Sequence, residues 1–234
     1  MKKFPPQGWS VFELLWGGFC ISAIVALSLW WGEGALALSA AVTGMVYTLL
    51  AGKAKVSCFF FGMVNTPLYA FLSWREGYYG DMALNIYYFA MMFSGLAAWR
   101  RNPESGDPGT AVRRSLSFRG RVMWAAGLLS ATVPLWAVLS ICGGRAPLSD
   151  ALTNVFSVAA MVLTVKRCVE QWILWIAVDL VEVFMWWRVW AESGNSVSVL
   201  LMWLLFFVNG LYLWRMWSSE MRKRRLGGLS DGCG

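Results

Sequence analysis

The sequence has no histidine among its 234 residues, and only 14% of its residues are charged. Without histidine the chain cannot form the Ser-His or Cys-His pairs that activate nucleophiles, or the HExxH zinc site of metalloproteases. No GxxxxGK[ST] loop is present, so nothing indicates ATP hydrolysis. The five cysteines are scattered and form no CxxC pair, which argues against a disulfide framework or a zinc site. We therefore predict that the protein is not an enzyme and carries no cofactor.

Hydrophobic residues are abundant instead, at 58% of the chain, and the mean hydropathy is +0.54. They form eight long runs, each near the roughly 17–25 residues that cross a bilayer as a helix. We therefore predict an all-α polytopic membrane protein. The sixth and seventh runs are short and are expected to gain about a turn from their flanks. The runs are Val11–Trp31, Ala35–Ala51, Val56–Trp74, Met82–Trp99, Val122–Cys142, Ala151–Val165, Trp172–Trp187 and Ser196–Trp214.

The basic residues predict the orientation of these spans, because cytoplasmic loops of membrane proteins are enriched in Lys and Arg. With a cytoplasmic N-terminus, 17 of the 20 basic residues lie inside, and only Arg75, Arg145 and Arg188 lie outside. The C-terminus is then predicted to be cytoplasmic. The +7 net charge then needs no nucleic acid as a partner. If the first run lies along the membrane surface, seven spans remain and the later topology is unchanged.

A repeat is visible across the polar stretch Arg100–Arg121. An offset of 114 residues places Lys53 on Arg167 and Asn65 on Asp179. This predicts two parallel three-helix repeats joined by one crossover helix (3+1+3), plus an extra N-terminal hydrophobic helix. Carriers built from such repeats bind substrate near mid-membrane. The predicted parts are the N-terminal helix 1–34, the first repeat 35–100, the linker and crossover helix 101–149, the second repeat 150–217 and a basic tail 218–234.

Polar and aromatic residues share one face of the seventh run. At 100° per residue, Trp172, Trp175, Asp179, Glu182 and Trp186 lie within about an 80° arc, and Gln171 borders it. An ionised carboxylate at the bilayer centre costs roughly 2.5–3.5 kcal/mol on insertion scales, so this face is expected to point into the bundle. Indole rings attract flat cationic rings by roughly 0.5–2 kcal/mol each. The face is typical of a binding surface, although each member can also serve only helix packing.

Further polar residues occur within the other runs. Asn65 lies in the third, Asn85 and Tyr88 share one face of the fourth, and Asn209 lies deep in the eighth. Asparagine within membrane helices often only joins neighbouring helices. The predicted substrate-binding set is therefore Gln171, Trp172, Trp175, Asp179, Glu182, Asn65, Asn85, Tyr88 and Asn209, without any metal ligand.

These motifs resemble the PnuC family of nicotinamide riboside transporters. The opening WSVFELLW, the segments FFFGMVNTPLYAF and GYYGDMALNIYYF, and VEQWILWIAVD with its WxxW pair appear in the family's order from about Trp9 to Trp217. The resemblance implies a SWEET-like fold and facilitated, ion-independent uptake of nicotinamide riboside by alternating access. It further implies a location in the bacterial inner membrane and trapping of the substrate by a cytoplasmic kinase. Trp172 and Trp175 would stack on the base, and Gln171, Asn65 and Asn85 would hydrogen-bond the substrate. Asp179 occupies a position that is often Asn in the family.

Several alternatives stay open at the level of sequence. The cargo can be thiamine, riboflavin or a deoxynucleoside, which related branches carry. Asp179 and Glu182 can also form the acid–base pair of an intramembrane enzyme or line a cation channel, although no nucleophile motif supports the enzyme. Substrate affinity, proton coupling and the oligomeric state do not follow from the sequence.

Overall fold

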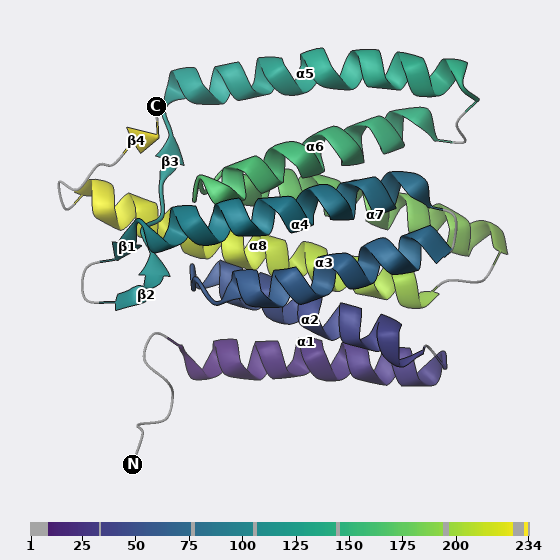
Figure 1. Cartoon of the computed structure of the whole chain (residues 1–234), viewed down its shortest axis with the longest axis horizontal. Helices are drawn as coiled ribbons and strands as arrows, with labels where there is room; N and C mark the ends of the chain where they lie inside the picture. Colours follow the sequence, from purple (N-terminus) through teal and green to yellow (C-terminus); the bar gives the residue numbers. More distant parts are fainter. Residues whose placement is uncertain are drawn as a thin grey trace. The chain divides into compact units, whose positions relative to one another are not determined.

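The computed structural model describes residues 9–32, 34–75, 78–104, 107–143, 146–193, 197–226 and 232–233. Lys2, Lys3 and Arg145, which enter the charge count above, lie outside these residues. The described part contains eight helices and four short strands (Figure 1). The helices are α1 (Val11–Trp30), α2 (Ala35–Gly52), α3 (Cys58–Arg75), α4 (Tyr79–Arg100), α5 (Phe118–Ile141), α6 (Pro147–Val165), α7 (Gln171–Ser193) and α8 (Val197–Leu226). The strands are β1 (Pro103–Glu104), β2 (Asp107–Ala111), β3 (Ser115–Leu116) and β4 (Gly232–Cys233).

Each predicted apolar run corresponds to one helix, and no helix stops more than two residues short of the end of its run, so the all-α class is confirmed. The two short runs do gain residues, since α6 begins at Pro147 and α7 continues to Ser193. Six of the described helices are long and apolar enough to cross a membrane. The two that fall below that criterion are α3 and α7, which carry Asn65 and the two acids Asp179 and Glu182. The polar candidates are therefore concentrated in the least apolar helices, which need protein neighbours most.

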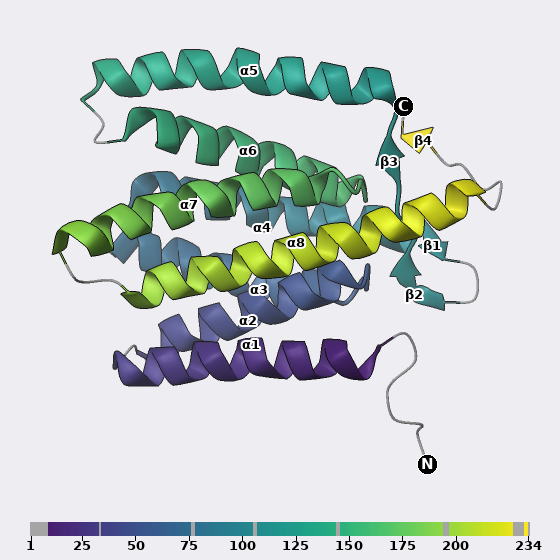
Figure 2. The ribbon, with the colours of Figure 1, turned by 180° about the vertical axis from the view of Figure 1, so that it is seen from behind.

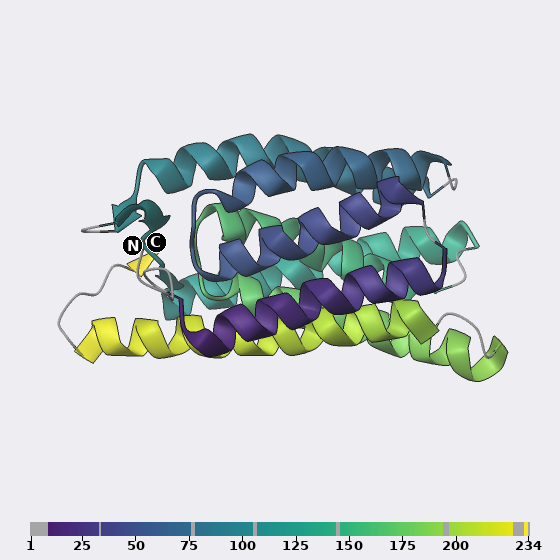
Figure 3. The same cartoon turned by 90° about the horizontal axis from the view of Figure 1, so that it is seen from below.

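The chain divides into two compact units, residues 1–111 and 112–234, so the boundary falls inside the predicted linker. In the first unit α1 packs against α2, α2 against α3 and α3 against α4. Figure 3 shows α1 and α2 as an antiparallel pair. Strands β1 and β2 form an antiparallel hairpin after α4. The centre of this unit holds the T-shaped ring pair of Phe59 and Trp99, whose centroids are 4.9 Å apart.

The second unit repeats this order of contacts. Here α5 packs against α6, α6 against α7 and α7 against α8, as Figure 2 shows from behind. Its buried cluster includes Ala159, Ala160, Leu163 and Leu174, with Trp175 packed against it. Small residues on α6 let α7 approach closely, which is how membrane helices gain packing energy.

Helix α1 begins with a capping box, and the acid of this box also pairs with the loop that follows α2. The Ser10 side chain accepts a hydrogen bond from the Glu13 backbone N–H at 3.1 Å, and the Glu13 carboxylate accepts one from the Ser10 N–H at 2.7 Å. The same carboxylate accepts a hydrogen bond from Lys53 Nζ at 2.8 Å. One acid therefore both begins the helix and ties it to the next loop.

The loops before α3 and α7 have the same backbone structure, and this corrects the register of the repeat. Ala54 (φ 54°) and Arg167 (φ 63°), 113 residues apart, both adopt the left-handed conformation. The hydrogen bonds from Lys55 N to Leu50 O and from Cys168 N to Leu163 O, each 2.9 Å, show the same offset. The expected offset of 114 was wrong by one residue here, because it aligned basic side chains and the fold repeats a backbone turn. Thr66, rather than Asn65, corresponds to Asp179.

Each of these loops is also held by the polar segment between the two triple-helix sets. In the first unit the Val56 N–H donates to Gly109 O at 2.9 Å, and in the second the Val169 N–H donates to Arg114 O at 2.8 Å. Lys55 Nζ lies 2.6 Å from Asp107 Oδ2. This hydrogen bond lowers the pKa of Asp107 to about 2, so the pair stays ionised at neutral pH. The predicted linker is therefore structured, and it is hydrogen-bonded to both loops.

The basic C-terminal segment is helical. Helix α8 runs without a break past the end of the predicted span at Trp214 and into the predicted basic tail, as far as Leu226. Glu220 explains the extension, because its carboxylate pairs with Arg113 at 2.6 Å and with Arg224 at 3.1 Å. The second pair is one helical turn apart, a spacing that stabilises helices. The remaining domain limits stay predictions.

Candidate substrate-binding site

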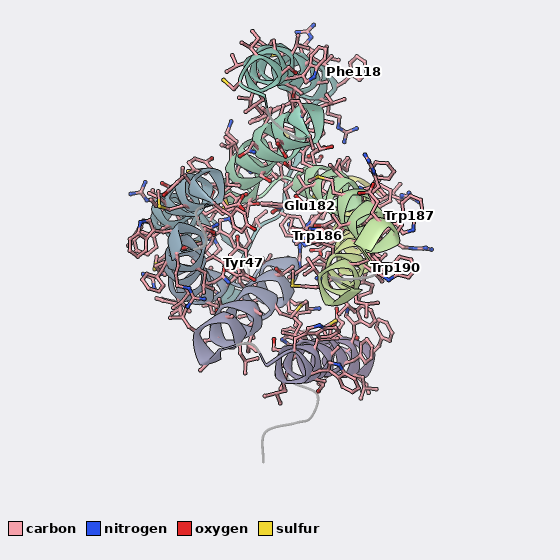
Figure 4. All side chains as sticks on the ribbon, turned by 90° about the vertical axis from the view of Figure 1, so that its right-hand side faces the viewer. Tyr47, Phe118, Glu182, Trp186, Trp187 and Trp190 are labelled. Atoms are coloured by element: carbon pink, nitrogen blue, oxygen red, sulfur yellow. The ribbon has the colours of Figure 1, made fainter. Side chains whose placement is uncertain are left out.

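The polar face of α7 is buried at its N-terminal end and in its middle. Gln171 is the first residue of the helix and is 1% exposed, and Asp179 two turns later is 7% exposed. Trp175 and Glu182 between and beyond them are half-buried. Figure 4 shows Glu182 and Trp186 on one side of the α7 ribbon, with Trp187 and Trp190 on the other. The predicted face thus points away from the exposed tryptophans of the same helix.

Trp172 is fixed by an aromatic contact from α8. Its ring meets Trp217 in a T-shaped arrangement with centroids 5.8 Å apart. The guanidinium carbon of Arg113 lies 5.2 Å from the Trp217 ring, and Arg113 pairs with Glu220. The Trp172 indole N–H is buried and has no hydrogen-bond partner in the described part of the chain. The ring is therefore held firmly, while its polar atom remains available to a ligand.

Trp175 lies one turn further along and is oriented by α6. Its indole N–H donates to the Thr164 hydroxyl at 3.5 Å, the long limit of such a bond. Thr164 in turn donates to the Ala160 carbonyl at 2.9 Å. The Trp175 ring packs against the buried cluster of the second unit. Its half-buried state leaves part of the ring surface open for stacking.

Asp179 faces a glycine of α8. A Cβ atom on Gly210 would lie 3.5 Å from Asp179 Oδ2 and 3.1 Å from Ile176 Cγ1. The glycine therefore lets the two helices approach closely beside the carboxylate. Asn209, its neighbour in sequence, is fully buried.

In the first unit the polar candidates make mainly local contacts. The Asn65 amide donates to the Ala40 carbonyl of α2 at 2.7 Å, and its Nδ2 lies against Gly44. Asn85 donates to Asp81 O of its own helix at 2.9 Å. Tyr88 is half-buried with its ring 5.8 Å from that of Tyr87. For Asn65 the amide N–H is thus used in joining two helices, which leaves its carbonyl oxygen for a ligand.

Three residues in contact with the α7 face were not expected from the sequence: Thr164, Gly210 and Trp217. Each lies on a neighbouring helix, and no local pattern marks it. The small residues Thr164 and Gly210 fit a general rule, that membrane helices meet at small side chains, but the rule does not say which ones. Within the described residues, no three Asp, Glu, Cys or His side chains are close enough to hold a metal ion.

Comparison with known proteins adds a family to this geometry. The family model described as nicotinamide mononucleotide transporter matches residues 34–219. The nicotinamide riboside transporter PnuC of Neisseria mucosa is 30% identical over 221 residues, 92% of this chain and 84% of the relative. The chain belongs to the PnuC family. The PnuC of Haemophilus influenzae is 27% identical over 95% of this chain and 96% of its own length.

A solved PnuC structure supports the same assignment. The crystal structure of the vitamin B3 transporter PnuC is similar with a TM-score of 0.78 and 31% identity, covering 92% of this chain and 94% of that one. The recognition of the family from the WxxW motif and the order of segments is confirmed. Because PnuC proteins are transporters, this chain is a multi-pass membrane transporter rather than an enzyme.

Proposed function

We propose that this protein carries nicotinamide riboside across the bacterial inner membrane by facilitated diffusion with alternating access. The observation that carries the proposal is the similarity, over nearly the whole chain, to relatives named nicotinamide riboside transporter. A cytoplasmic kinase then phosphorylates the nucleoside and traps it inside. The proposal does not depend on association between copies of the chain.

The α7 face supports this cargo by its chemistry. Nicotinamide riboside combines a flat cationic pyridinium ring, an amide and a hydroxylated sugar. The open part of the Trp175 ring suits stacking on the pyridinium, and Trp172 and Gln171 bring buried donors with no partner in the described chain. Glu182 and Asp179 supply negative charge on the same face. Each feature of the substrate thus has a complementary group on one helix.

The four other predicted residues lie on other helices: Asn65, Asn85 and Tyr88 in the first unit and Asn209 in the second. Asn65 would accept a hydrogen bond through its carbonyl oxygen, since its amide N–H is donated to Ala40. Asn85 and Tyr88 would contribute polar atoms from α4, and Asn209 from α8. Their substitution is expected to weaken binding less than loss of either tryptophan, because a neutral hydrogen bond contributes roughly 0.5–1.5 kcal/mol.

Binding is tested first by quenching of tryptophan fluorescence in purified protein. Saturable quenching by nicotinamide riboside is expected for the wild type. Trp175→Ala should raise the Kd at least tenfold, whereas Trp187→Ala, an exposed position on the same helix, should not change it. Thiamine serves as a competitor, since it too is a cationic aromatic vitamin. Tight binding of thiamine without nicotinamide riboside binding would replace the cargo and leave the transporter class unchanged.

Transport is tested in proteoliposomes with labelled nicotinamide riboside. Facilitated diffusion predicts equilibration to the outside concentration and stimulation by unlabelled substrate inside the vesicle. Accumulation above that level is expected only when a nicotinamide riboside kinase and ATP are enclosed. Accumulation driven by an imposed proton gradient alone would contradict facilitated diffusion, and an ohmic current in place of saturable flux would indicate a channel.

A further inference from the structure

Asp179 differs from Glu13 and Glu170, the other two buried acids that the structure describes, because no cation pairs with it there. Glu13 pairs with Lys53 at 2.8 Å, Glu170 with Arg121 at 2.9 Å, and Glu220 with Arg113 at 2.6 Å. Asp179 is 7% exposed, yet no ion pair or hydrogen bond to its carboxylate occurs in the described part of the chain. A buried charge without a partner is costly, so such groups are normally paired or coordinated.

The neighbouring helix α8 packs closely against the carboxylate of Asp179 without giving it a partner. At the level of Asp179, helix α8 presents Gly210, which has no side chain to donate a proton or a charge. The nearest charged group along α7 is Glu182, one turn away and of the same sign. The surroundings therefore increase the need for a positive charge from outside the chain.

Two unpaired donors also point to a ligand on the same face. Gln171 is 1% exposed and Trp172 is 4% exposed. The Gln171 Nε2 and Trp172 Nε1 donors are both buried without a hydrogen-bond partner in the described residues. Buried donors in native proteins are nearly always satisfied by protein, water or ligand. Two donors and one carboxylate on the same side of α7 therefore lack partners among the described residues. A polar ligand with a positive charge would satisfy all three.

We propose that Asp179 makes this transporter selective for aromatic substrates that carry a positive charge, by supplying the counter-charge to the substrate ring. The inference rests on the proposed function for the location of the site, but it concerns the substrate's charge rather than its name. Neutral rings of the same size and shape leave the carboxylate unpaired and bind more weakly. Substrates with an added phosphate meet like charge from Asp179 and Glu182.

The test compares two ligands of nearly equal shape, nicotinamide riboside and its uncharged dihydro form. Binding of each to purified protein is measured by fluorescence quenching or calorimetry. The wild type is expected to prefer the cation at least tenfold, because hydrogen bonds to charged groups contribute more than neutral ones. Asp179→Asn, a change of almost no volume, should weaken binding of the cation roughly ten- to a hundredfold and leave the neutral form within threefold.

The matched control is Glu192→Gln. Glu192 is an exposed carboxylate on the same helix, 3.3 Å from Arg188, and its neutralisation should change neither affinity. Thermal stability gives an independent readout. Without ligand, Asp179→Asn should unfold at the same or a higher temperature than the wild type, because it removes an unpaired buried charge. A lower unfolding temperature would show that Asp179 has a structural partner and would overturn the proposal.

The outcomes separate this inference from the proposed cargo. Equal wild-type affinity for the charged and neutral forms overturns the charge selectivity and leaves nicotinamide riboside as cargo. Binding of thiamine alone, lost in Asp179→Asn, replaces the cargo and supports the selectivity for cations. Failure to bind either cation overturns both proposals.

Discussion

At the residue scale, the contacts around Trp172 explain how an indole ring can be fixed while its polar atom stays available. The Trp172 ring forms a T-shaped pair with Trp217, and the guanidinium of Arg113 lies over the Trp217 ring. Aromatic pairs of this geometry contribute about 0.5–1.5 kcal/mol beyond the area they bury. Trp217 is therefore a positioning residue for the proposed site, although it lies on another helix.

Substitution of Trp217 tests this role. In Trp217→Leu an apolar side chain remains but the aromatic edge is lost, so the Trp172 ring should populate other orientations. We expect the Kd for nicotinamide riboside to rise about two- to tenfold, matching the energy of the ring pair. The maximal transport rate should stay unchanged in proteoliposomes. Trp214→Leu, at an exposed position one turn earlier on α8, is the control and should match the wild type. An unchanged Kd in Trp217→Leu would contradict the positioning role.

At the scale of elements, the helices were predictable and their connections were not. The α7 face could be recognised from sequence because its period of 3.6 residues lies within one helix. The attachment of the hairpin β1–β2 to the loop before α3 could not be, because it depends on Lys55 and Asp107, which lie far apart in sequence. The repeat was recognised with an error of one residue in its offset. The left-handed turn that fixes the offset is occupied by Ala54 and Arg167, and neither residue type indicates such a turn in the sequence.

Helix packing in the first unit predicts a contrast between two glycines of α4. A Cβ on Gly95 would overlap with the buried Phe59 ring, whereas nothing lies within 4 Å of one on Gly80. Gly95→Ala should therefore lower the free energy of unfolding by about 1–3 kcal/mol through overpacking. Gly80→Ala should be neutral or slightly stabilising, because alanine favours helix. Unfolding in mixed detergent, followed by circular dichroism, measures both; equal stabilities would contradict the packing described.

The two left-handed loop residues predict a second contrast. Ala54→Gly should stabilise the protein by up to about 1 kcal/mol, because glycine adopts φ 54° without steric cost. Arg167→Gly should not, since it also removes the hydrogen bond from Arg167 Nη1 to Val112 O at 3.3 Å. The difference between the two unfolding temperatures is the measurement. A loss of stability in Ala54→Gly would show that the loop is not strained there.

At the scale of the whole molecule, the distribution of basic residues predicts how the chain lies in the membrane. In the predicted orientation, the ion pairs of Lys53 and Lys55 in the first unit lie at the cytoplasmic ends of the helices, as do those of Arg113 and Arg121 in the second. The exposed pair of Arg188 and Glu192 lies at the outer end of α7. A positive-inside arrangement thus also places each paired acid beside water rather than in the hydrocarbon core, which lowers its cost.

Cys142 provides a natural reporter for this orientation. It follows α5 and is exposed, whereas Cys20, Cys58 and Cys168 are buried. The predicted topology places Cys142 outside and Cys233 in the cytoplasm. In a Cys233→Ser background, a membrane-impermeant maleimide should therefore label Cys142 in intact spheroplasts. In Cys142→Ser, labelling of Cys233 should require permeabilised membranes. The opposite labelling pattern would place the basic loops outside and would contradict the orientation predicted by the positive-inside rule.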